Sequence, residues 1–463
     1  MSTVSSAPLE TLEEHMDWLL EIYRDFHRHP ELSLREHRTA ARIVEELRAI
    51  ETATGAAEHP EGGFELTTGL GLTGVVAVLR RGTGPTVLLR ADIDGLPVRE
   101  ETGLDWASRD TGVPYRQEAP HHADDVGADQ LSDIDQLPGG DSDQHTGEQL
   151  PVMHACGHDT HIVCLLGTLR MLLESAQHAD SAQWSGTVVA VFQPAEEQHN
   201  GAERMVADGL ARTIPVPDVA LGQHVMPGPA DAVEIAEGPI MAASDDFRIT
   251  LHGKGAHASV PHRGIDPVVM AASLVMRLQT VVSRHTDPEA TAVVTVGRID
   301  GGTKNNIIPE QAVIEGTVRS FDAEVSRRCR EVITQMARAE AVAHGAPEPH
   351  VEFYDQLPVT DNDPGTAQTV RAALTEEFGA ERVTEMARRS GAEDFSVLPA
   401  AFGIPYAYWG FGAFDPEAWH ACTDPEAEFP GNHSPQFAPL AEVSLRTGVR
   451  ALTTAAWAWL GAR

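Results

Sequence analysis

Apolar residues recur with two different periods along the chain, and the period predicts which segments form helices and which form strands. Apolar residues repeat every three or four positions over residues 12–47, which predicts helix on both sides of a break at His29-Pro30. The same spacing predicts a helix over residues 160–174. Short runs rich in β-branched residues predict strands at residues 74–80, 86–90, 187–192 and 218–222. Strands that alternate with helices in this way predict an α/β domain with a largely parallel sheet.

The pattern changes between residues 244 and 353. Alternating stretches there predict strands, and two long amphipathic stretches predict helices at 266–284 and 323–344. The order is strand, helix, strand, strand, helix, strand (βαββαβ), which forms a ferredoxin-like α+β fold with both helices on one face of a four-stranded sheet. We interpret residues 244–353 as a domain inserted between two parts of a first domain, 1–243 and 354–463, because a candidate functional residue, His433, follows it.

The length of the chain predicts the number of domains, and its net charge bears on the kinds of partner it can bind. A chain of 463 residues is too long for one ordinary hydrophobic core, so two domains are expected. The 69 acidic and 34 basic residues give a net charge of −35, which disfavours nucleic acid and anionic membranes as partners because both need a basic face. No apolar run in the sequence is long enough to cross a membrane.

Two further features bear on location and on one unusual segment. The first residues are acidic rather than basic, which argues against a secretory signal, and the four cysteines form no even-spaced framework, so a reducing cytoplasmic location is predicted. Residues 105–150 contain eleven acidic residues and few apolar ones, which predicts a flexible, solvated insertion. Loose metal binding by the His and Asp residues of this insertion is the alternative.

Residues of metal-binding type gather in one short motif and recur at three later points. The motif is MHACGHD at 153–159, in which Gly157 lets the side chains on either side turn toward one point. The candidate ligands are Cys156 and His158 in this motif, Glu196 and Glu197 in FQPAEEQ, His224 in GQHVMP and His433 in GNHSPQF. One thiolate, three imidazoles and two adjacent carboxylates are enough for a two-metal hydrolytic centre with its own general base. The Gly and Pro residues around them predict ligands on loops at strand ends.

The ligand types indicate which metals fit the centre. Thiolate is a soft ligand and imidazole a borderline one, so the set favours Zn²⁺, Co²⁺, Ni²⁺ or Mn²⁺ over Mg²⁺ and Ca²⁺. Without metal, Cys156 is expected to be a reactive thiolate.

A pair of adjacent carboxylates could supply the general base of the predicted site. Glu196 and Glu197 follow a buried strand, and we expect one to bind metal and the other to act as general base toward the attacking water. The alternative is a helix N-terminus, where acidic residues are favoured. Asp92 and Asp94 in RADIDGLP also follow a strand. They would bind metal, orient a ligand imidazole or simply form a polar turn, and the residues alone leave these options open.

The inserted segment contains three polar residues that could contact a substrate. His257 in GKGAHASVPHRG would donate a hydrogen bond to a developing oxyanion. Asn306 in GGTKNNIIPE and Arg319 in GTVRSF would bind a substrate carboxylate, the arginine in bidentate fashion. Ordinary polarity at a sheet edge is the alternative for each.

Taken together, these motifs resemble the M20 metallopeptidases, in particular the N-acyl-amino-acid amidohydrolase branch that includes hippurate hydrolases and auxin-conjugate hydrolases. The resemblance covers nearly the whole chain. It rests on ten segments in this order: FHRHPELSLREHRTA, RADIDGLPVREETGL, MHACGHDTH, FQPAEEQHNGAERMV, GQHVMP, GKGAHASVPHRGIDPV, GGTKNNIIPE, GTVRSF, GAEDFS and HSPQF. The departure from the family is the acidic stretch after Trp106, which looks inserted.

The resemblance implies a fold and a set of site residues. The fold would be α/β, a mixed-sheet di-metal exopeptidase-like catalytic domain with a ferredoxin-like lid that forms a homodimer. Two divalent ions per subunit would be bound by Cys156, His158, Glu197, His224 and His433. Glu196 would be the general base and Asp94 a supporting carboxylate. His257, Asn306 and Arg319 would reach the substrate from the lid.

The expected reaction is hydrolysis of the amide bond of a small N-acyl amino acid to a carboxylic acid and a free amino acid. A carboxypeptidase or an aminobenzoyl-glutamate-type hydrolase with the same centre is one alternative. A catalytically silent binding protein of the same fold is another, and the intact set of ligands and base argues against it.

Overall fold

The computed structural model describes residues 8–56, 62–115, 149–175 and 184–461. Most of the acidic insertion predicted at 105–150 lies outside the described residues. Contacts divide the chain into two compact units. Unit 1 is built from three stretches, the first ending at Gly112, the second running from Gln149 to Ala242 and the third beginning at Leu357, whereas unit 2 contains Ala243–Gln356. The domain boundaries predicted from the sequence are 243/244 and 353/354.

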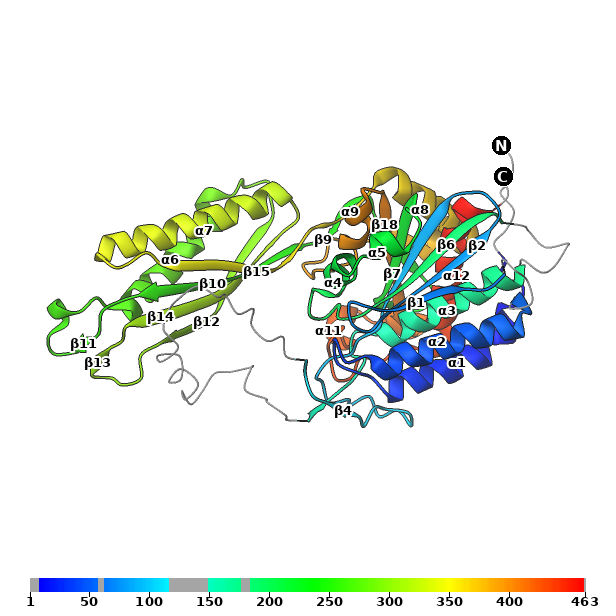
Figure 1. Ribbon diagram of the computed structural model, residues 1–463, viewed down its shortest axis with the longest axis horizontal. Coiled ribbons are helices and arrows are strands. Elements are labelled where there is room, and N and C mark those ends of the chain that lie inside the picture. The colour runs from blue at the N-terminus through cyan, green and yellow to red at the C-terminus, as the bar shows by residue number, and fades with distance from the viewer. Residues whose placement is uncertain (1–7, 57–61, 116–148, 176–183, 462–463) are drawn as a thin grey trace. The chain divides into compact units, whose positions relative to one another are not determined.

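Unit 1 contains an eight-stranded mixed sheet (Figure 1). In sheet order the strands are β1 (Glu65–Leu70), β2 (Gly74–Arg81), β6 (Gly186–Gln193), β3 (Thr86–Asp92), β7 (Val219–Pro229), β18 (Tyr406–Phe414), β8 (Val233–Ile235) and β17 (Val383–Glu385). The central strands β6, β3, β7 and β18 run parallel, and the pairs β1/β2, β2/β6 and β18/β8 are antiparallel. The mixed α/β sheet predicted for this domain is therefore confirmed.

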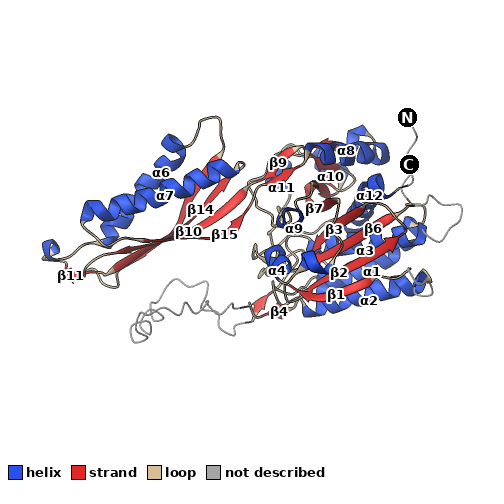
Figure 2. Cartoon of the chain, turned by 45° about the horizontal axis from the view of Figure 1, so that its top comes forward, coloured by secondary structure: helices blue, strands red, loops and turns tan. Residues whose placement is uncertain are grey.

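Helices cover both faces of this sheet (Figure 2). One face packs against α1 (Leu12–Arg28), α2 (His37–Ala53), α3 (His158–Ser175), α8 (Pro364–Phe378) and α12 (Ala441–Leu460). The other face packs against the shorter α4 (Gly201–Ala207), α5 (Leu210–Thr213) and α9 (Val397–Phe402). The alternation along β2 explains the two layers, since Val75 and Ala77 belong to the first core and Val76 and Val78 to the second. The predicted break at Pro30 is confirmed, because α1 ends at Arg28.

Smaller elements complete unit 1. They are the strand pairs β4 (Thr111–Gly112) with β5 (Leu150–Pro151) and β9 (Gly238–Met241) with β16 (Thr360–Asn362), and the short helices α10 (Pro416–Ala421) and α11 (Pro425–Glu428). Among the described residues, no helix has both the length and the apolar character that spanning a bilayer requires.

Unit 2 is a four-stranded sheet with two helices. In chain order its elements are β10 (Ala243–His252), α6 (Pro267–His285), β12 (Ala292–Gly301), β14 (Gln311–Ser320), α7 (Ala323–His344) and β15 (His350–Leu357), and the sheet order is β12-β14-β10-β15. A small pair, β11 (Ala256–His257) and β13 (Ile307–Ile308), accompanies them. Each long helix begins at an aspartate cap, Asp266 or Asp322, whose side chain accepts backbone N–H groups of the first turn. An apolar core lies between the sheet and both helices.

Candidate metal centre

A tight turn carries Cys156 and places His158 at the first position of α3. Gly157 lies between them with a φ of +84°, a conformation that favours glycine. A Cβ at this position would lie 2.3 Å from Cγ1 of Val225 and 3.3 Å from a ring carbon of Phe437. Glycine therefore lets the turn pack directly against β7, with the Cys156 and His158 side chains both buried.

Asp94 orients the ring of His158. The Nδ1 atom of His158 lies 3.0 Å from the backbone carbonyl oxygen of Asp94 and 3.2 Å from its Oδ1, and it donates to these acceptors. Its Nε2 is then the ring nitrogen with a free lone pair. The Oδ2 atom of Asp94 accepts hydrogen bonds from Ser33 and from the backbone N–H of Glu197. Of the options that the sequence left open for Asp94, this geometry favours a carboxylate that fixes the tautomer of a ligand imidazole.

The paired glutamates lie opposite His158, in a turn after β6 where Ala195 has a φ of +49°. From Nε2 of His158, Oε1 of Glu197 lies 3.8 Å away and Oε2 of Glu196 lies 3.9 Å away. The second oxygen of Glu197 lies 3.4 Å from Nε2 of His433. Within the described part of the chain, His158 Nε2 and Glu197 Oε1 are buried without a hydrogen-bond partner. Two unpaired buried atoms at this separation fit a bound metal ion, which would satisfy both.

His224 lies inside β7 rather than beyond its end, so the prediction that the ligands lie on loops is wrong for this residue. The reason lies in the neighbouring strands. Pairing with β3 ends at Arg90 opposite Gly222, whereas pairing with β18 continues and supports β7 to its end. The His224 ring approaches Cys156, with 3.4 Å between Nε2 and Sγ, and its Nδ1 donates to the carbonyl oxygen of Val225 at 2.7 Å.

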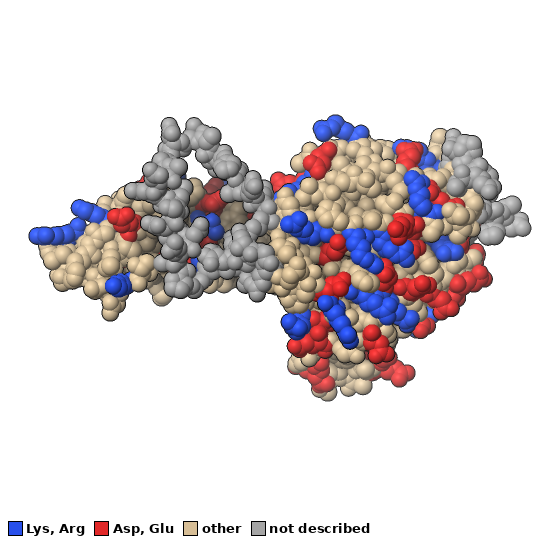
Figure 3. Space-filling view, turned by 60° about the horizontal axis from the view of Figure 1, so that its bottom comes forward, with Lys and Arg blue, Asp and Glu red and all other residues tan. Residues whose placement is uncertain are grey.

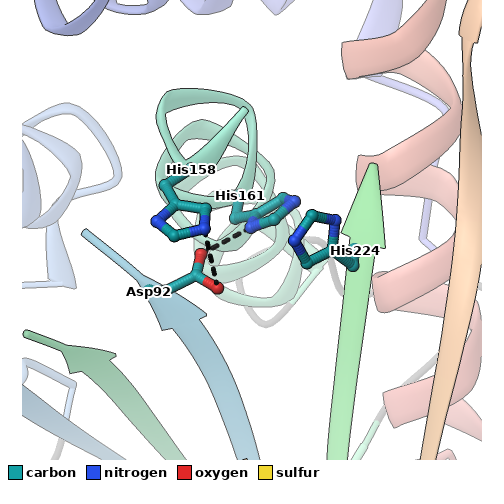
Figure 4. A group of neighbouring side chains, drawn as sticks. All are labelled: Asp92, His158, His161 and His224. Atoms are coloured by element: carbon teal, nitrogen blue, oxygen red, sulfur yellow. Dashed lines mark hydrogen bonds and ion pairs between the residues drawn. The ribbon is translucent and has the colours of Figure 1, made fainter. Parts of the chain in front are cut away.

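His161, which the sequence analysis did not single out, lies beside His158 and His224 (Figure 4). Its Nδ1 donates to Asp92, and its Nε2 accepts from the backbone N–H of Val225 at 2.8 Å. Because both ring nitrogens are engaged, His161 has no free lone pair for a metal and supports its neighbours instead. The signal that could have found it is the spacing of three between His158 and His161, which places both on one face of a helix.

A fully buried arginine, Arg90, links Asp92 to a second group of acids. Its guanidinium donates to Asp92 at 2.6 Å, to Glu393 at 2.8 Å and to Asp394 at 3.1 Å. Carboxylate oxygens of Glu196, Glu393 and Asp394 lie within 4.8 Å of one another. The two adjacent acids of the GAEDFS segment were a signal for this group that the sequence analysis did not use.

The electrostatics of the cluster favour a cation. Burial, followed by the negative charges of Glu197 and Glu196, raises the pKa of the Cys156 thiol well above its usual value. Burial also raises the pKa of Glu197 to about 8, although His158 opposes the shift. This direction runs against the expectation that Cys156 is a reactive thiolate without metal, because a raised pKa favours the protonated thiol. A divalent cation favours the deprotonated thiolate and carboxylate, so the donor set fits a metal centre.

Three further predicted residues belong to unit 2. His257 is exposed in β11, with its Nδ1 2.7 Å from the hydroxyl oxygen of Ser259. Asn306 is exposed in the turn before β13. Arg319 is half-buried in β14, opposite Val293 of β12. Their part in substrate binding stays a prediction.

Relatives of known activity share most of this chain. It matches Peptidase family M20/M25/M40 over residues 131–447. It is 34% identical to the N-acetyl-L-cysteine deacetylase of Bacillus subtilis over 414 residues, which cover 89% of this chain and 83% of that protein. It is 32% identical to thermostable carboxypeptidase 1 of Saccharolobus solfataricus, over 83% of this chain and 84% of that protein.

A solved structure gives the same answer for the fold. A dinuclear metal-binding peptidase of the M20 family from Bacillus subtilis superposes with a TM-score of 0.68 at 27% identity, over 96% of this chain and 98% of that one. The fold class predicted from the sequence is thereby confirmed, and the deacetylase agrees with the predicted N-acyl-amino-acid branch. This chain belongs to the M20/M25/M40 family of peptidases.

Proposed function

We propose that this protein is a metal-dependent amidohydrolase that cleaves small N-acyl amino acids into a carboxylic acid and a free amino acid. The observation that carries the proposal is the pair of buried atoms, His158 Nε2 and Glu197 Oε1, which lie 3.8 Å apart without hydrogen-bond partners among the described residues. Donor atoms of Cys156 and His433 lie within 4.8 Å of Glu197, and His224 lies beside Cys156. Membership of the family supports the same class of reaction.

The proposed ligands of two divalent ions are Cys156, His158, Glu197, His224 and His433. Ions bound there would acidify a water molecule and polarise the carbonyl of the scissile amide. Zn²⁺, Mn²⁺, Co²⁺ and Ni²⁺ are the proposed metals, since a thiolate with imidazoles favours these over Mg²⁺ or Ca²⁺.

Glu196 is the proposed general base. Its carboxylate lies 3.9 Å from Nε2 of His158, beside the ligands, and next to the acids that Arg90 holds. In the proposed mechanism it takes a proton from the attacking water and returns that proton to the leaving amine. Asp94 keeps Nε2 of His158 directed at the centre through its hydrogen bond to Nδ1.

We propose that residues of unit 2 bind the substrate. His257 would donate to the oxyanion that forms when the carbonyl is attacked. Asn306 and Arg319 would bind the carboxylate of the amino-acid half, the arginine through two parallel hydrogen bonds. The exposed positions of His257 and Asn306 support this role, because a ligand can reach them.

A homodimer formed through unit 2 is also proposed. The strand β12 is at an edge of the four-stranded sheet, and its Val293 and Ile299 side chains are 47% and 51% exposed. A long edge strand with apolar side chains favours pairing with another chain. The edge of β12 is therefore the proposed site of contact between two copies.

The reduced cysteines bear on the location of the protein, and its net charge bears on which other partners it binds. All four cysteines are free thiols, which supports the proposed cytoplasmic location. On the face of unit 1 in Figure 3, basic side chains are interspersed with acidic ones rather than gathered into one basic patch. Together with the net charge of −35, this favours small molecules over nucleic acid as partners.

A carboxypeptidase or an aminobenzoyl-glutamate-type hydrolase with the same centre is the second candidate. It is favoured by the identity of 32% to a carboxypeptidase, which is close to the 34% shared with the deacetylase. A catalytically silent binding protein is disfavoured, because Glu196 is retained beside the proposed ligands.

A substrate panel tests the two activities on the purified full chain. N-acetyl amino acids, N-benzoyl amino acids and unblocked dipeptides are supplied separately, and metal content is measured on the same sample. We expect amino acid to be released fastest from N-acyl substrates, with about two divalent ions bound per chain. Preferential cleavage of dipeptides would favour the carboxypeptidase, and absence of both cleavage and metal would overturn the proposal.

A matched pair of cysteine variants tests the ligand assignment. Cys156→Ala should lose bound metal and turnover together, because the thiolate is a proposed ligand. Cys164→Ala is the control, since Cys164 is buried in α3 within the apolar core and is not a proposed ligand. Equal metal content in the two variants would remove Cys156 from the ligand set.

A further inference from the structure

Side chains form hydrogen bonds with the backbone of Val225, at a point of β7 beyond the end of its pairing with β3. Pairing with β3 ends at Gly222, three residues earlier. The N–H of Val225 donates to Nε2 of His161 at 2.8 Å, and its carbonyl oxygen accepts from Nδ1 of His224 at 2.7 Å. These bonds satisfy backbone groups that a paired strand would otherwise satisfy. The position of the His224 ring therefore depends on how the Val225 peptide is held.

Asn432 contributes a further bond to the same carbonyl group. Its Nδ2 donates to the carbonyl oxygen of Val225 at 3.1 Å and to that of Cys156 at 3.2 Å. Both amide hydrogens are used in this way. The opposite amide orientation would place Oδ1 against two carbonyl oxygens, so the two acceptors fix the orientation. One side chain thus ties the turn that carries Cys156 to the strand that carries His224.

The segment that contains Asn432 is attached to the same turn by its own backbone. The N–H of His433 donates to the carbonyl oxygen of Ala155 at 2.8 Å. Asn432 is therefore placed where three segments meet, and these segments carry the proposed ligands Cys156, His224 and His433. A change in its amide would alter the separations of these side chains without removing any of them.

We propose that Asn432 is a positioning residue for the metal centre. By bridging the carbonyl groups of Cys156 and Val225, its amide sets the separation between the Cys156 thiolate and the His224 imidazole. With both donor hydrogens engaged, Asn432 acts through its neighbours rather than on the substrate. The inference rests on the proposed function, because it requires Cys156 and His224 to bind metal.

Asn432→Asp is the most informative variant, because it keeps the shape of the side chain and removes both donor hydrogens. Asn432→Ala removes the whole amide. We expect both variants to weaken Zn²⁺ binding about 10- to 100-fold, as substitutions of residues that orient metal ligands do. Competition with a chromophoric chelator measures this affinity on the full chain. In Co²⁺-loaded protein, the thiolate-to-metal absorption band should shift in position or intensity.

Gln436→Ala is the matched control, because Gln436 is an exposed amide in the same loop. It should bind Zn²⁺ as the wild type does. The melting temperature of each metal-free variant shows whether an affinity loss merely follows a loss of stability, which would overturn the inference. Wild-type affinity and an unchanged Co²⁺ spectrum in both Asn432 variants would also overturn it. Failure of the wild-type protein to bind any metal would instead overturn the proposed function.

Discussion

The candidate metal centre of unit 1 differs from unit 2 in how its buried acids are neutralised. In unit 2, the buried Asp245 and Glu340 each have an arginine of their own, Arg330 and Arg277. At the candidate metal centre of unit 1, one buried arginine, Arg90, is shared by Asp92, Glu393 and Asp394. Glu196 and Glu197 lie beside this group and face the ring of His158. Buried charges destabilise a fold unless they are paired or bind an ion. Unit 1 is therefore expected to respond to metal and to charge changes, and unit 2 to changes at its surface.

The largest effect is expected from neutralising the proposed base in unit 1. Glu196→Gln should lower kcat about 10²- to 10⁴-fold while metal content stays unchanged, because it removes the proton acceptor and keeps the shape of the side chain. Steady-state rates and metal analysis on the same preparation measure both quantities. Glu203→Gln, an exposed position seven residues later, is the control. Turnover close to wild type in Glu196→Gln would exclude Glu196 as the base.

A second prediction concerns pH and a buried histidine of unit 1. Burial lowers the pKa of His27, but hydrogen bonds to Asp159 and Glu100 outweigh burial and raise it to about 9 from 6.5. Because the folded pKa exceeds the unfolded one, the stabilisation is complete below pH 6.5 and is lost as pH rises through about 9. It amounts to on the order of 3 kcal/mol.

Chemical denaturation of wild type and His27→Gln across this pH range measures the contribution. The difference in unfolding free energy between the two proteins should be largest near pH 6 and shrink toward pH 10. A difference that stays constant with pH would contradict the raised pKa.

A third prediction compares the thermal stability of the two units after the metal has been removed. Chelation should lower the melting temperature of unit 1 and leave that of unit 2 unchanged, because the proposed ligands all lie in unit 1. At free metal 100-fold above the dissociation constant, binding stabilises the folded state by about 2.7 kcal/mol. Differential scanning calorimetry with and without chelator measures the transitions. An unchanged melting temperature of unit 1 after chelation would contradict the prediction that only unit 1 responds to metal.

The smallest effect on stability is expected at the surface of unit 2. Ile299→Lys on β12 should convert the proposed dimer to monomer, because a charged side chain on an edge strand opposes pairing with another chain. The free energy of unfolding of the monomer should change by less than about 0.5 kcal/mol. Sedimentation velocity measures the association state. Val216→Lys is the control, an equally apolar and 67% exposed position in unit 1, and should remain dimeric.

Local sequence was enough to find most of the candidate ligands and both fold patterns. Cys156, Gly157 and His158 lie within three residues, so their convergence depends on one turn. The helices and strands of unit 2 could be predicted from periodicity because its core is apolar. Each of its two long helices is also directly preceded in the sequence by the aspartate that caps it. In these cases the information that determines the structure is close together in the chain.

The features that were missed depend on contacts between distant residues. Arg90 and Glu393 are 303 positions apart, so no local pattern connects them. His224 lies within a strand because β18 extends past the end of β3, which only the sheet topology determines. The raised pKa of the Cys156 thiol is caused first by burial, and burial is a property of the folded chain.

The place of β18 has a consequence for biosynthesis. This strand lies between β7 and β8 in the sheet, yet 177 positions separate Pro229 at the end of β7 from Tyr406 at the start of β18. At a translation rate of about 5–20 residues per second, the ribosome needs roughly 10–35 s to make this stretch. Until β18 has been made, one edge of β7 lacks the strand that covers it in the folded protein, and an unpaired strand edge can pair with other chains.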